Sequence, residues 1–297
     1  MTNNGATQTT PSTLMPSLFI SHGAPTLPIE ESPARDFFLG LGDEIPSPAA
    51  ILIVSAHWDT DSLGLLAGAQ TLDTIHDFYG FPQALYDMQY PAPGIDKPRI
   101  DKLGNDTLSE KIVTTLDKAG FKVSVDGQRG LDHGAWVPLK LMYPQANIPV
   151  TQVSVNTLQS PEYHWRLGRA LAPLRQDNVL IIGSGTMTHN LSEVGNFHGE
   201  RNAFDEADYV TEFSRWMETK ILDCDIDALL QYQTRAPHAE RAHPTAEHLL
   251  PLYVALGAAG VSWQAELLHR SCVYGVINLD SYLFKKIVNN TKTNPIS

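Results

Sequence analysis

The stretch Ala50-Ile51-Leu52-Ile53-Val54-Ser55-Ala56-His57-Trp58 carries the pattern from which the fold is predicted. Its leading apolar residues, rich in β-branched side chains, are typical of a strand buried on both faces, and the small polar residues after them end such a strand. The same order recurs at residues 17–23 (SLFISHG) and 179–185 (VLIIGSG). Each of the three runs leads to a histidine, and these are His22, His57 and His189.

Segments with helical periodicity alternate with these strands. Residues 101–119 and 161–174 carry apolar side chains at helical spacing, and Gly120 is a stop signal for the first of them. A fourth apolar run, residues 148–155, is expected to pair in the same sheet. The pattern predicts an α/β fold: a single-domain sandwich with a central, mostly parallel or mixed sheet flanked by helices.

The domain limits follow from the position of these runs. Histidines at strand ends come from both halves of the chain, so one domain is expected over residues 16–286. Residues 1–15 are expected to be a disordered tail, and residues 287–297 a polar C-terminal tail. Because ligands of open α/β sheets bind outside the carboxyl ends of the strands, we expect the active site there.

Composition limits which binding partners and which cellular compartment are expected. The formal net charge is −12, which disfavours nucleic acid and anionic membranes as partners. No apolar run reaches the roughly 20 residues of a membrane span, and residues 1–13 lack the features of a secretory signal. Cys224 and Cys272 fit no disulfide or thiolate motif. A cytoplasmic protein is therefore expected, and its oligomeric state is left open.

The strand-end histidines indicate a metal site. Neutral imidazole is a common ligand of divalent metals, and a mononuclear catalytic centre needs about three protein ligands with a position left open. One histidine at a strand end is more often structural, but three at equivalent ends favour a shared ion.

A further candidate ligand, His248, lies in Pro-Thr-Ala-Glu-His-Leu-Leu-Pro at residues 244–251. Thr245 is expected to cap a helix with His248 in its first turn, which Pro251 would kink. Glu247 is the alternative ligand, since the common non-haem iron triad has two histidines and one carboxylate.

Two more segments carry candidate functional residues. In residues 130–136 (GLDHGAW), glycines predict a tight loop in which His133 hydrogen-bonds a substrate, transfers protons, or simply pairs with Asp132. Residues 76–82 (HDFYGFP) gather aromatic side chains suited to a planar ring, on a loop expected to cover the strand ends. Candidates for substrate binding are His76, Phe78, Tyr79 and Trp136.

Taken together, the motifs resemble the 4,5-DOPA extradiol dioxygenase family, which belongs to the class III, LigB-type ring-cleavage enzymes. The resemblance runs in the family's order from Pro16 to Gly260 and rests on residues 21–25, 55–58, 76–82, 131–136, 183–190 and 243–257. It implies a non-haem iron(II) enzyme that opens the ring of a DOPA-like or caffeate-like catechol with O₂.

The resemblance also implies roles for individual residues. His22, His57 and His248 would bind the metal, and His189 would be either a fourth ligand or the catalytic acid and base. His133 would lie in the substrate pocket as a second catalytic histidine. Class III relatives with a glutamate ligand keep Glu247 as a candidate. Zinc suits the same ligands, but it has no accessible redox state and would not support the oxidation.

Two other functions are compatible with the same residues. A mononuclear zinc hydrolase is one, because zinc bound to histidines lowers the pKa of its water to about 7. A relative that has lost catalysis and binds a peptide partner in the same cleft is the other. The aromatic residues within 78–81 favour a planar substrate, which argues against the hydrolase. The full set of histidines argues against a relative that has lost catalysis.

Overall fold

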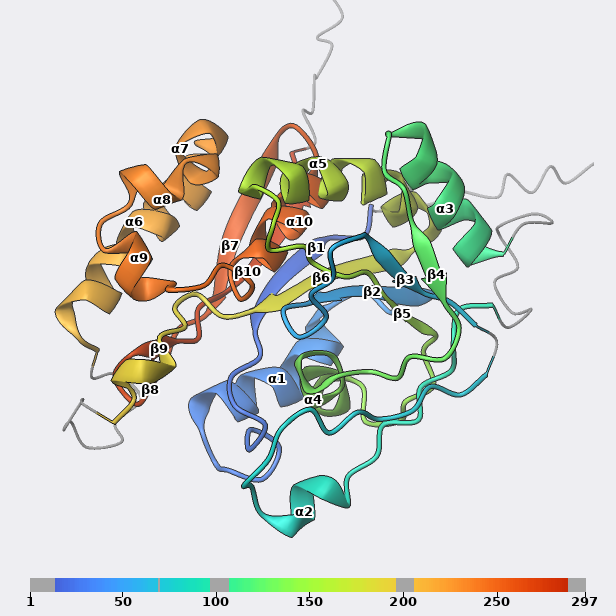
Figure 1. Cartoon of the computed structure of the whole chain (residues 1–297), viewed down its shortest axis with the longest axis horizontal. Helices are drawn as coiled ribbons and strands as arrows, with labels where there is room; N and C mark the ends of the chain where they lie inside the picture. Colours follow the sequence, from blue (N-terminus) through green and yellow to red (C-terminus); the bar gives the residue numbers. More distant parts are fainter. Residues whose placement is uncertain (1–13, 69, 97–106, 196–205, 288–297) are drawn as a thin grey trace, which may run out of the picture.

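The central sheet has six strands in the order β5-β2-β6-β1-β10-β7 (Figure 1). This is the arrangement in a computed structural model of the chain, which describes residues 14–68, 70–96, 107–195 and 206–287. Strands β5, β2, β6 and β1 are parallel, while β10 is antiparallel to both β1 and β7. The sheet strands are β1 (Ser17–Ser21), β2 (Ala50–Ser55), β5 (Val150–Gln152), β6 (Val179–Gly185), β7 (Trp263–His269) and β10 (Ser281–Lys286).

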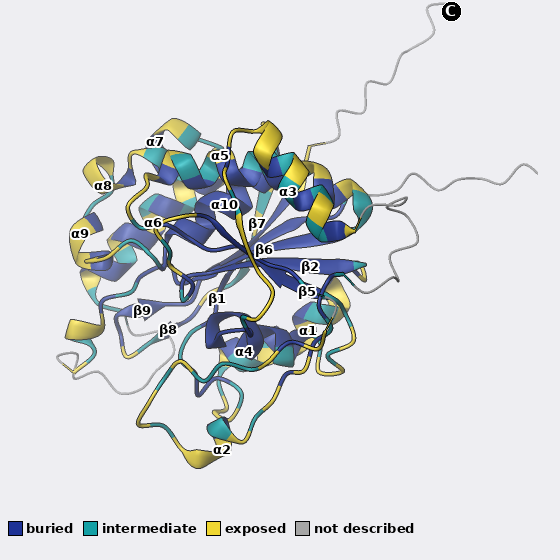
Figure 2. Ribbon diagram, turned by 45° about the vertical axis from the view of Figure 1, so that its right-hand side comes forward, coloured by how far each residue is buried: buried dark blue, intermediate teal, exposed yellow. Residues whose placement is uncertain are grey.

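Helices cover both faces of this sheet (Figures 1 and 2). On one face α10 (Leu250–Ala259) packs against β1 and β6, with α5 (Pro161–Leu171) outside it and α3 (Leu108–Lys118) beside α5. Every residue of α10 is buried, which its apolar sequence explains. On the other face lie α1 (Pro33–Glu44) and α4 (His133–Met142). The predicted α/β sandwich with a mixed, mainly parallel sheet is confirmed.

Further helices and short strands complete the fold around the sheet. Near the β7 side, a group of helices follows the chain from residue 208 to residue 242: α6 (Asp208–Leu222), α7 (Ile226–Leu230), α8 (Tyr232–Arg235) and α9 (Ala239–Ala242). The remaining elements are β3 (Gly64–Leu66), β4 (Ser124–Asp126), β8 (Cys272–Val273), β9 (Ile277–Asn278), α2 (Gln83–Tyr86), η1 (Ala172–Asp177) and η2 (Leu191–Glu193). Within the ranges that the structure describes, no helix is long and apolar enough to cross a membrane.

Two glycines bring α5 and α10 into direct backbone contact. A Cβ atom on Gly168 would lie 2.1 Å from the carbonyl oxygen of Val254, and one on Gly257 would lie 2.0 Å from that of Trp165. Any side chain at these positions would push the helices apart. The contact fixes α10 against the sheet, and with it the turn that immediately precedes α10.

Several predicted elements are confirmed and others have different limits. The three quoted strands and the fourth in the same sheet are present, and Gly120 follows α3 with a φ of +87°. The first helix begins at Leu108 within the described residues; residues 101–106 of the prediction lie outside them, as do residues 1–13 and 288–297 of the two predicted tails. Strands β7 and β10 were not predicted.

Candidate metal centre

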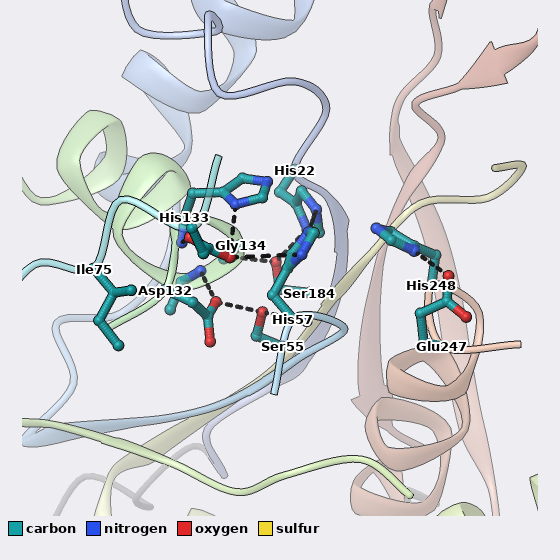
Figure 3. A network of polar contacts seen from close by, with 12 residues as sticks. His22, Ser55, His57, Ile75, Asp132, His133, Gly134, Ser184, Glu247 and His248 are labelled. Carbon is teal, nitrogen blue, oxygen red and sulfur yellow. Dashed lines mark hydrogen bonds and ion pairs between the residues drawn. The ribbon is translucent and has the colours of Figure 1, made fainter. Parts of the chain in front are cut away.

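Neighbouring strands end at one level, and this places the first two histidines together. Ser21 at the end of β1 pairs with Gly185 of β6, and Ser55 at the end of β2 pairs with Ser184. His22 follows β1 directly, and its backbone N–H donates to the Gly185 carbonyl at 3.0 Å. His57 follows the end of β2 by two residues. The imidazoles of His22 and His57 therefore meet at the carboxyl edge of the sheet (Figure 3).

His248 comes from a turn in front of α10, not from inside a helix. The helix begins at Leu250, so the predicted cap at Thr245 is wrong; the hydroxyl of Thr245 donates to the Glu247 carboxylate at 2.9 Å instead. Pro251 lies in the first turn of α10, where a backbone N–H has no intrahelical acceptor. A proline there therefore costs the helix no hydrogen bond. The predicted kink is therefore not needed.

A close backbone approach ties this turn to the end of β6. The N–H of Thr186 donates to the carbonyl of His248 at 2.9 Å. A Cβ on Gly185 would lie only 2.0 Å from the same carbonyl oxygen, so glycine is required there. Figure 3 shows the His248 ring pointing toward His22 and His57 from the side opposite His133.

The spacing of the three rings suits one bound cation. One ring nitrogen each from His22, His57 and His248 lie within 4.8 Å of one another, and the Nε2 atoms of His22 and His57 are 3.1 Å apart. Two nitrogens bound to one ion at about 2.1 Å are separated by roughly 3.0–3.4 Å for bond angles between octahedral and tetrahedral. The convergence of these three predicted ligands is observed.

A chain of hydrogen bonds fixes the tautomer of His22. The hydroxyl of Ser184 donates to the carbonyl of Gly134 at 2.5 Å, so its single proton is used (Figure 3). The Ser184 oxygen, 3.0 Å from Nδ1 of His22, must then accept from an Nδ1–H. Nε2 of His22 is left with its lone pair facing the cluster.

The neighbouring carboxylate does the same for His248. Glu247 Oε1 lies 3.0 Å from Nδ1 of His248 and can only accept when ionised. Nε2 of His248 then carries the lone pair, and it is buried without a hydrogen-bond partner among the residues that the structure describes. Buried polar atoms are rarely left unpaired, so this nitrogen points to a ligand.

Burial keeps these imidazoles neutral. It lowers the pKa of His22 and of His248 well below the ordinary value, and the neighbouring imidazoles lower each pKa further. Burial also lowers the pKa of His57 to about 4, an effect to which His133 adds. Neutral imidazoles are metal ligands, whereas lone pairs facing each other at 3.1 Å repel unless a cation or a proton lies between them. The donor set therefore fits a divalent metal ion.

His133 begins a helix, so the predicted tight loop is wrong. Asp132 is the N-cap of α4 and accepts from the N–H of Ala135 at 3.2 Å. The carboxylate that contacts His133 is that of Asp77, with Oδ2 3.0 Å from Nδ1 of His133. Burial by itself would raise the pKa of Asp77, but the contacts with His133 outweigh it and lower that pKa.

Asp132 is instead fully buried and is the common acceptor of several hydrogen bonds next to the site. It accepts from the Ser55 hydroxyl at 2.6 Å, from the Gln152 amide at 2.9 Å and from the Arg129 guanidinium at 3.1 Å. Ser55 in turn accepts from the backbone N–H of His57 at 3.2 Å. The network joins the ends of β2 and β5 to the start of α4, and so fixes the backbone that carries His57.

His189 lies against His248 and outside the group of three nitrogens. It groups with Glu247 and His248 instead, and its Nδ1 is 4.0 Å from Glu247 Oε1. Burial lowers the pKa of His189 to about 4. Its loop is held by His243, whose ring nitrogen contacts the Met187 carbonyl at 2.8 Å.

The predicted substrate-binding residues occupy different environments. Phe78 is half-buried, with its ring 5.8 Å edge-on from that of His133, and His76 lies 5.7 Å from Phe78. Trp136 is fully buried, and its indole N–H donates to the Ile75 carbonyl at 2.9 Å. Tyr79 is 92% exposed. Their roles in substrate binding stay predictions.

Three polar residues of the site were not singled out from the sequence as candidates: Asp77, Ser184 and His243. Asp77 is next to His76 in an aromatic motif, and Ser184 lies in the small polar turn that ends the third strand run. A signal was present in each case, since all three belong to the motifs quoted above. Their partners, however, lie 50 or more residues away in the chain.

Neutral imidazoles gathered at the carboxyl edge of an α/β sheet define a metal-dependent enzyme. The model of the family described as the catalytic LigB subunit of aromatic ring-opening dioxygenase matches residues 16–285, and the chain belongs to this LigB family. Like its relatives, it is an extradiol ring-cleavage dioxygenase, an activity that takes a catechol and O₂.

Similar proteins cover nearly the whole chain. It is 42% identical over 273 residues to the 4,5-DOPA dioxygenase extradiol of Beta vulgaris, covering 90% of this chain and 96% of that protein. It is 38% identical over 251 residues to the protein of the same name from Escherichia coli K12, covering 83% and 86%. The crystal structure of an uncharacterized protein from Escherichia coli K12 has a TM-score of 0.71 at 30% identity, covering 91% of this chain and 99% of that one.

Proposed function

We propose that this enzyme is iron(II)-dependent and cleaves the ring of a catechol with an extended side chain, of the DOPA or caffeate type. The observation that carries the proposal is the convergence of His22, His57 and His248, with ring nitrogens within 4.8 Å of one another, in a chain of the LigB family. Relatives named 4,5-DOPA dioxygenase extradiol support the substrate class.

The three histidines would hold the metal through Nε2. Held by these three histidines, iron(II) would supply the redox chemistry between a catechol and O₂, which zinc does not. Glu247 is better suited to support His248 than to replace it, because its Oε1 lies at the Nδ1 side of that ring. This is a carboxylate–histidine pair of the kind that orients metal ligands.

His189 would accept a proton from the catechol hydroxyl and return one as the ring opens. Its ring is neutral at pH 7 because burial lowers its pKa to about 4, so it starts as a proton acceptor. Contact with Glu247 favours the protonated ring and so offsets part of the burial effect. His189 can therefore hold a proton during turnover without leaving its place beside His248.

His133 and Phe78 would bind the aromatic substrate. Nδ1 of His133 faces Asp77, which leaves Nε2 as an acceptor for a substrate hydroxyl. The Phe78 and His133 rings are in edge-to-face contact, with centroids 5.8 Å apart, and Phe78 would offer an apolar surface next to His133. An aromatic substrate would exclude water from this side of the site.

The test is anaerobic loading of the purified protein with iron(II), followed by L-DOPA or caffeate and then oxygen. We expect oxygen uptake together with a yellow ring-opened product. The zinc-loaded protein should bind the catechol without consuming oxygen. His22→Ala should lose metal and activity, whereas His238→Ala, which removes an exposed histidine paired with Glu212, should keep both.

The result that overturns the proposal is equally specific. Full iron occupancy without oxygen uptake on any catechol in a panel would reject it. Activity with zinc and none with iron would favour the hydrolase reading instead.

A further inference from the structure

Asp77 makes three contacts with the site through one carboxylate. Oδ1 accepts from the backbone N–H of His133 at 2.8 Å. Oδ2 lies 3.0 Å from Nδ1 of His133 and 3.7 Å from Nδ1 of His57. The side chain is 23% exposed, so it lies at the edge of the cluster and not in the core.

We propose that Asp77 is a positioning residue that fixes the orientation and the tautomer of both His57 and His133, directing Nε2 of each ring into the site. The inference deepens the proposed function and rests on it for the effect on turnover. Its effect on metal binding does not depend on which reaction is catalysed.

The tautomers follow from the charge of Asp77, whose Oδ2 faces Nδ1 of His133 at 3.0 Å as an ion-pair contact and Nδ1 of His57 at 3.7 Å, beyond hydrogen-bond distance. An ionised carboxylate only accepts, so an imidazole nitrogen facing it is favoured as N–H. For His57 this leaves the lone pair on Nε2, the atom that lies 3.1 Å from Nε2 of His22. For His133 it leaves Nε2 as an acceptor toward the pocket. In metal sites, such carboxylates orient the ring and increase its basicity.

The backbone contact explains why the carboxylate keeps its place. His133 is the first residue of α4, and the N–H groups of a first helical turn have no intrahelical acceptor. An anionic side chain is favoured at this end of a helix. Asp77 thereby joins the aromatic loop to α4, with Phe78 as its chain neighbour. Loop position and ligand orientation are coupled through this one side chain.

Two substitutions separate tautomer control from simple packing. Asp77→Asn keeps the size and a carbonyl that can accept from the His133 backbone, but it can turn an amide N–H₂ toward the rings and favour the opposite tautomers. Asp77→Ala leaves Nδ1 of both rings to water, which accepts either tautomer. If Asp77 only filled space, the asparagine variant would be the milder one. We expect it to be at least as damaging as the alanine variant.

The experiment measures zinc affinity of the full-length chain by competition with a chromogenic chelator, then kcat and KM of the iron-loaded enzyme with L-DOPA. Both variants should bind zinc about 10–100-fold more weakly, and at saturating iron kcat should fall more than KM rises. Asp87→Asn is the matched control: it removes an exposed carboxylate close in sequence to Asp77 that, among the described residues, accepts a side-chain hydrogen bond from Gln83 alone, and it should match wild type. Urea unfolding of each variant checks that the fold is intact.

Two results would overturn the proposal: zinc affinity in Asp77→Asn equal to wild type, or an asparagine variant much closer to wild type than the alanine variant in both affinity and kcat. If wild type itself fails to consume oxygen with any catechol, the proposed function fails, while zinc affinity still decides the role of Asp77.

Discussion

The imidazole rings of His189 and His248 stack face to face, with centroids 3.4 Å apart and an interplanar angle of 14°. The two rings therefore lie in nearly parallel planes, yet His189 lies outside the group of three converging nitrogens. This arrangement favours proton transfer over metal binding for His189.

Replacing His189 by glutamine should therefore separate metal binding from turnover. We expect metal content near wild type and a kcat lower by about 10²–10⁴, the range for removal of a general acid or base. Metal analysis and oxygen uptake on the same sample measure both. His248→Ala is the comparison and should lose the metal. Loss of metal from His189→Gln to the same extent would identify His189 as a fourth ligand.

Gly134→Ala should damage the metal site although alanine favours helices. The added Cβ would lie 2.4 Å from Ser55 Oγ, 2.9 Å from His57 Cδ2 and 3.2 Å from His22 Cε1. We expect metal affinity to fall at least tenfold, since displacement of ligand rings outweighs the roughly 1 kcal/mol gained in helix propensity. Gly40→Ala in α1 is the control, because no atom of the described residues beyond its chain neighbours and its own helix backbone lies within 4 Å of the added Cβ; it should bind metal normally. Unchanged metal affinity in Gly134→Ala would contradict this close packing of Gly134 against the ligand rings.

Buried His164 should make stability pH-dependent. Its Nε2 accepts from the Asn156 N–H at 3.2 Å, and its Nδ1 contacts the Ser160 carbonyl at 2.9 Å, so the neutral ring fits. Burial lowers its pKa to about 4 from an ordinary value of 6.5. Between these values the unfolded chain binds a proton that the folded protein does not, so stability is lost as pH falls from 6.5 toward 4.

From pH 7.5 to pH 5 this one group should lower the free energy of unfolding by up to about 2 kcal/mol, at about 1.4 kcal/mol per pKa unit. Urea unfolding of the metal-free protein at both pH values measures it. His164→Gln should be less stable at pH 7.5 and should lose less on acidification. Equal losses for wild type and variant would show that His164 is not the group responsible.

The aromatic loop offers a test of substrate contact. Phe78→Ala should raise KM for a catechol several-fold, because a half-buried ring next to His133 is removed and burial of an aromatic side chain is worth about 1.5–3 kcal/mol. Tyr79→Ala should leave KM unchanged, since Tyr79 is 92% exposed. Steady-state oxygen uptake measures both variants. The reverse order of effects would place the substrate against Tyr79 instead.

Local patterns in the sequence were sufficient to predict the strands whose ends carry the site. The apolar runs that end at Ser21, Ser55 and Gly185 are strands, and in a parallel sheet the groups after such ends share one edge. His22 and His57 could therefore be placed together before any coordinates. Strands β7 and β10 escaped prediction: β7 is the only one of the two at an edge of the sheet and most of its residues are partly exposed, and β10 ends in two exposed lysines instead of a small polar turn.

The α/β class, the main strands and the histidines that approach one edge could be predicted from the amino-acid sequence, because hydrophobic periodicity and strand ends are local properties of the chain. Three assignments needed the folded structure: Glu247 contacts Nδ1 of His248, Asp77 and not Asp132 contacts the His133 ring, and Ser184 fixes the tautomer of His22. Those assignments depend on strand register and on close approach at Gly134 and Gly185, which bring together segments far apart in the chain. No local pattern encodes such contacts.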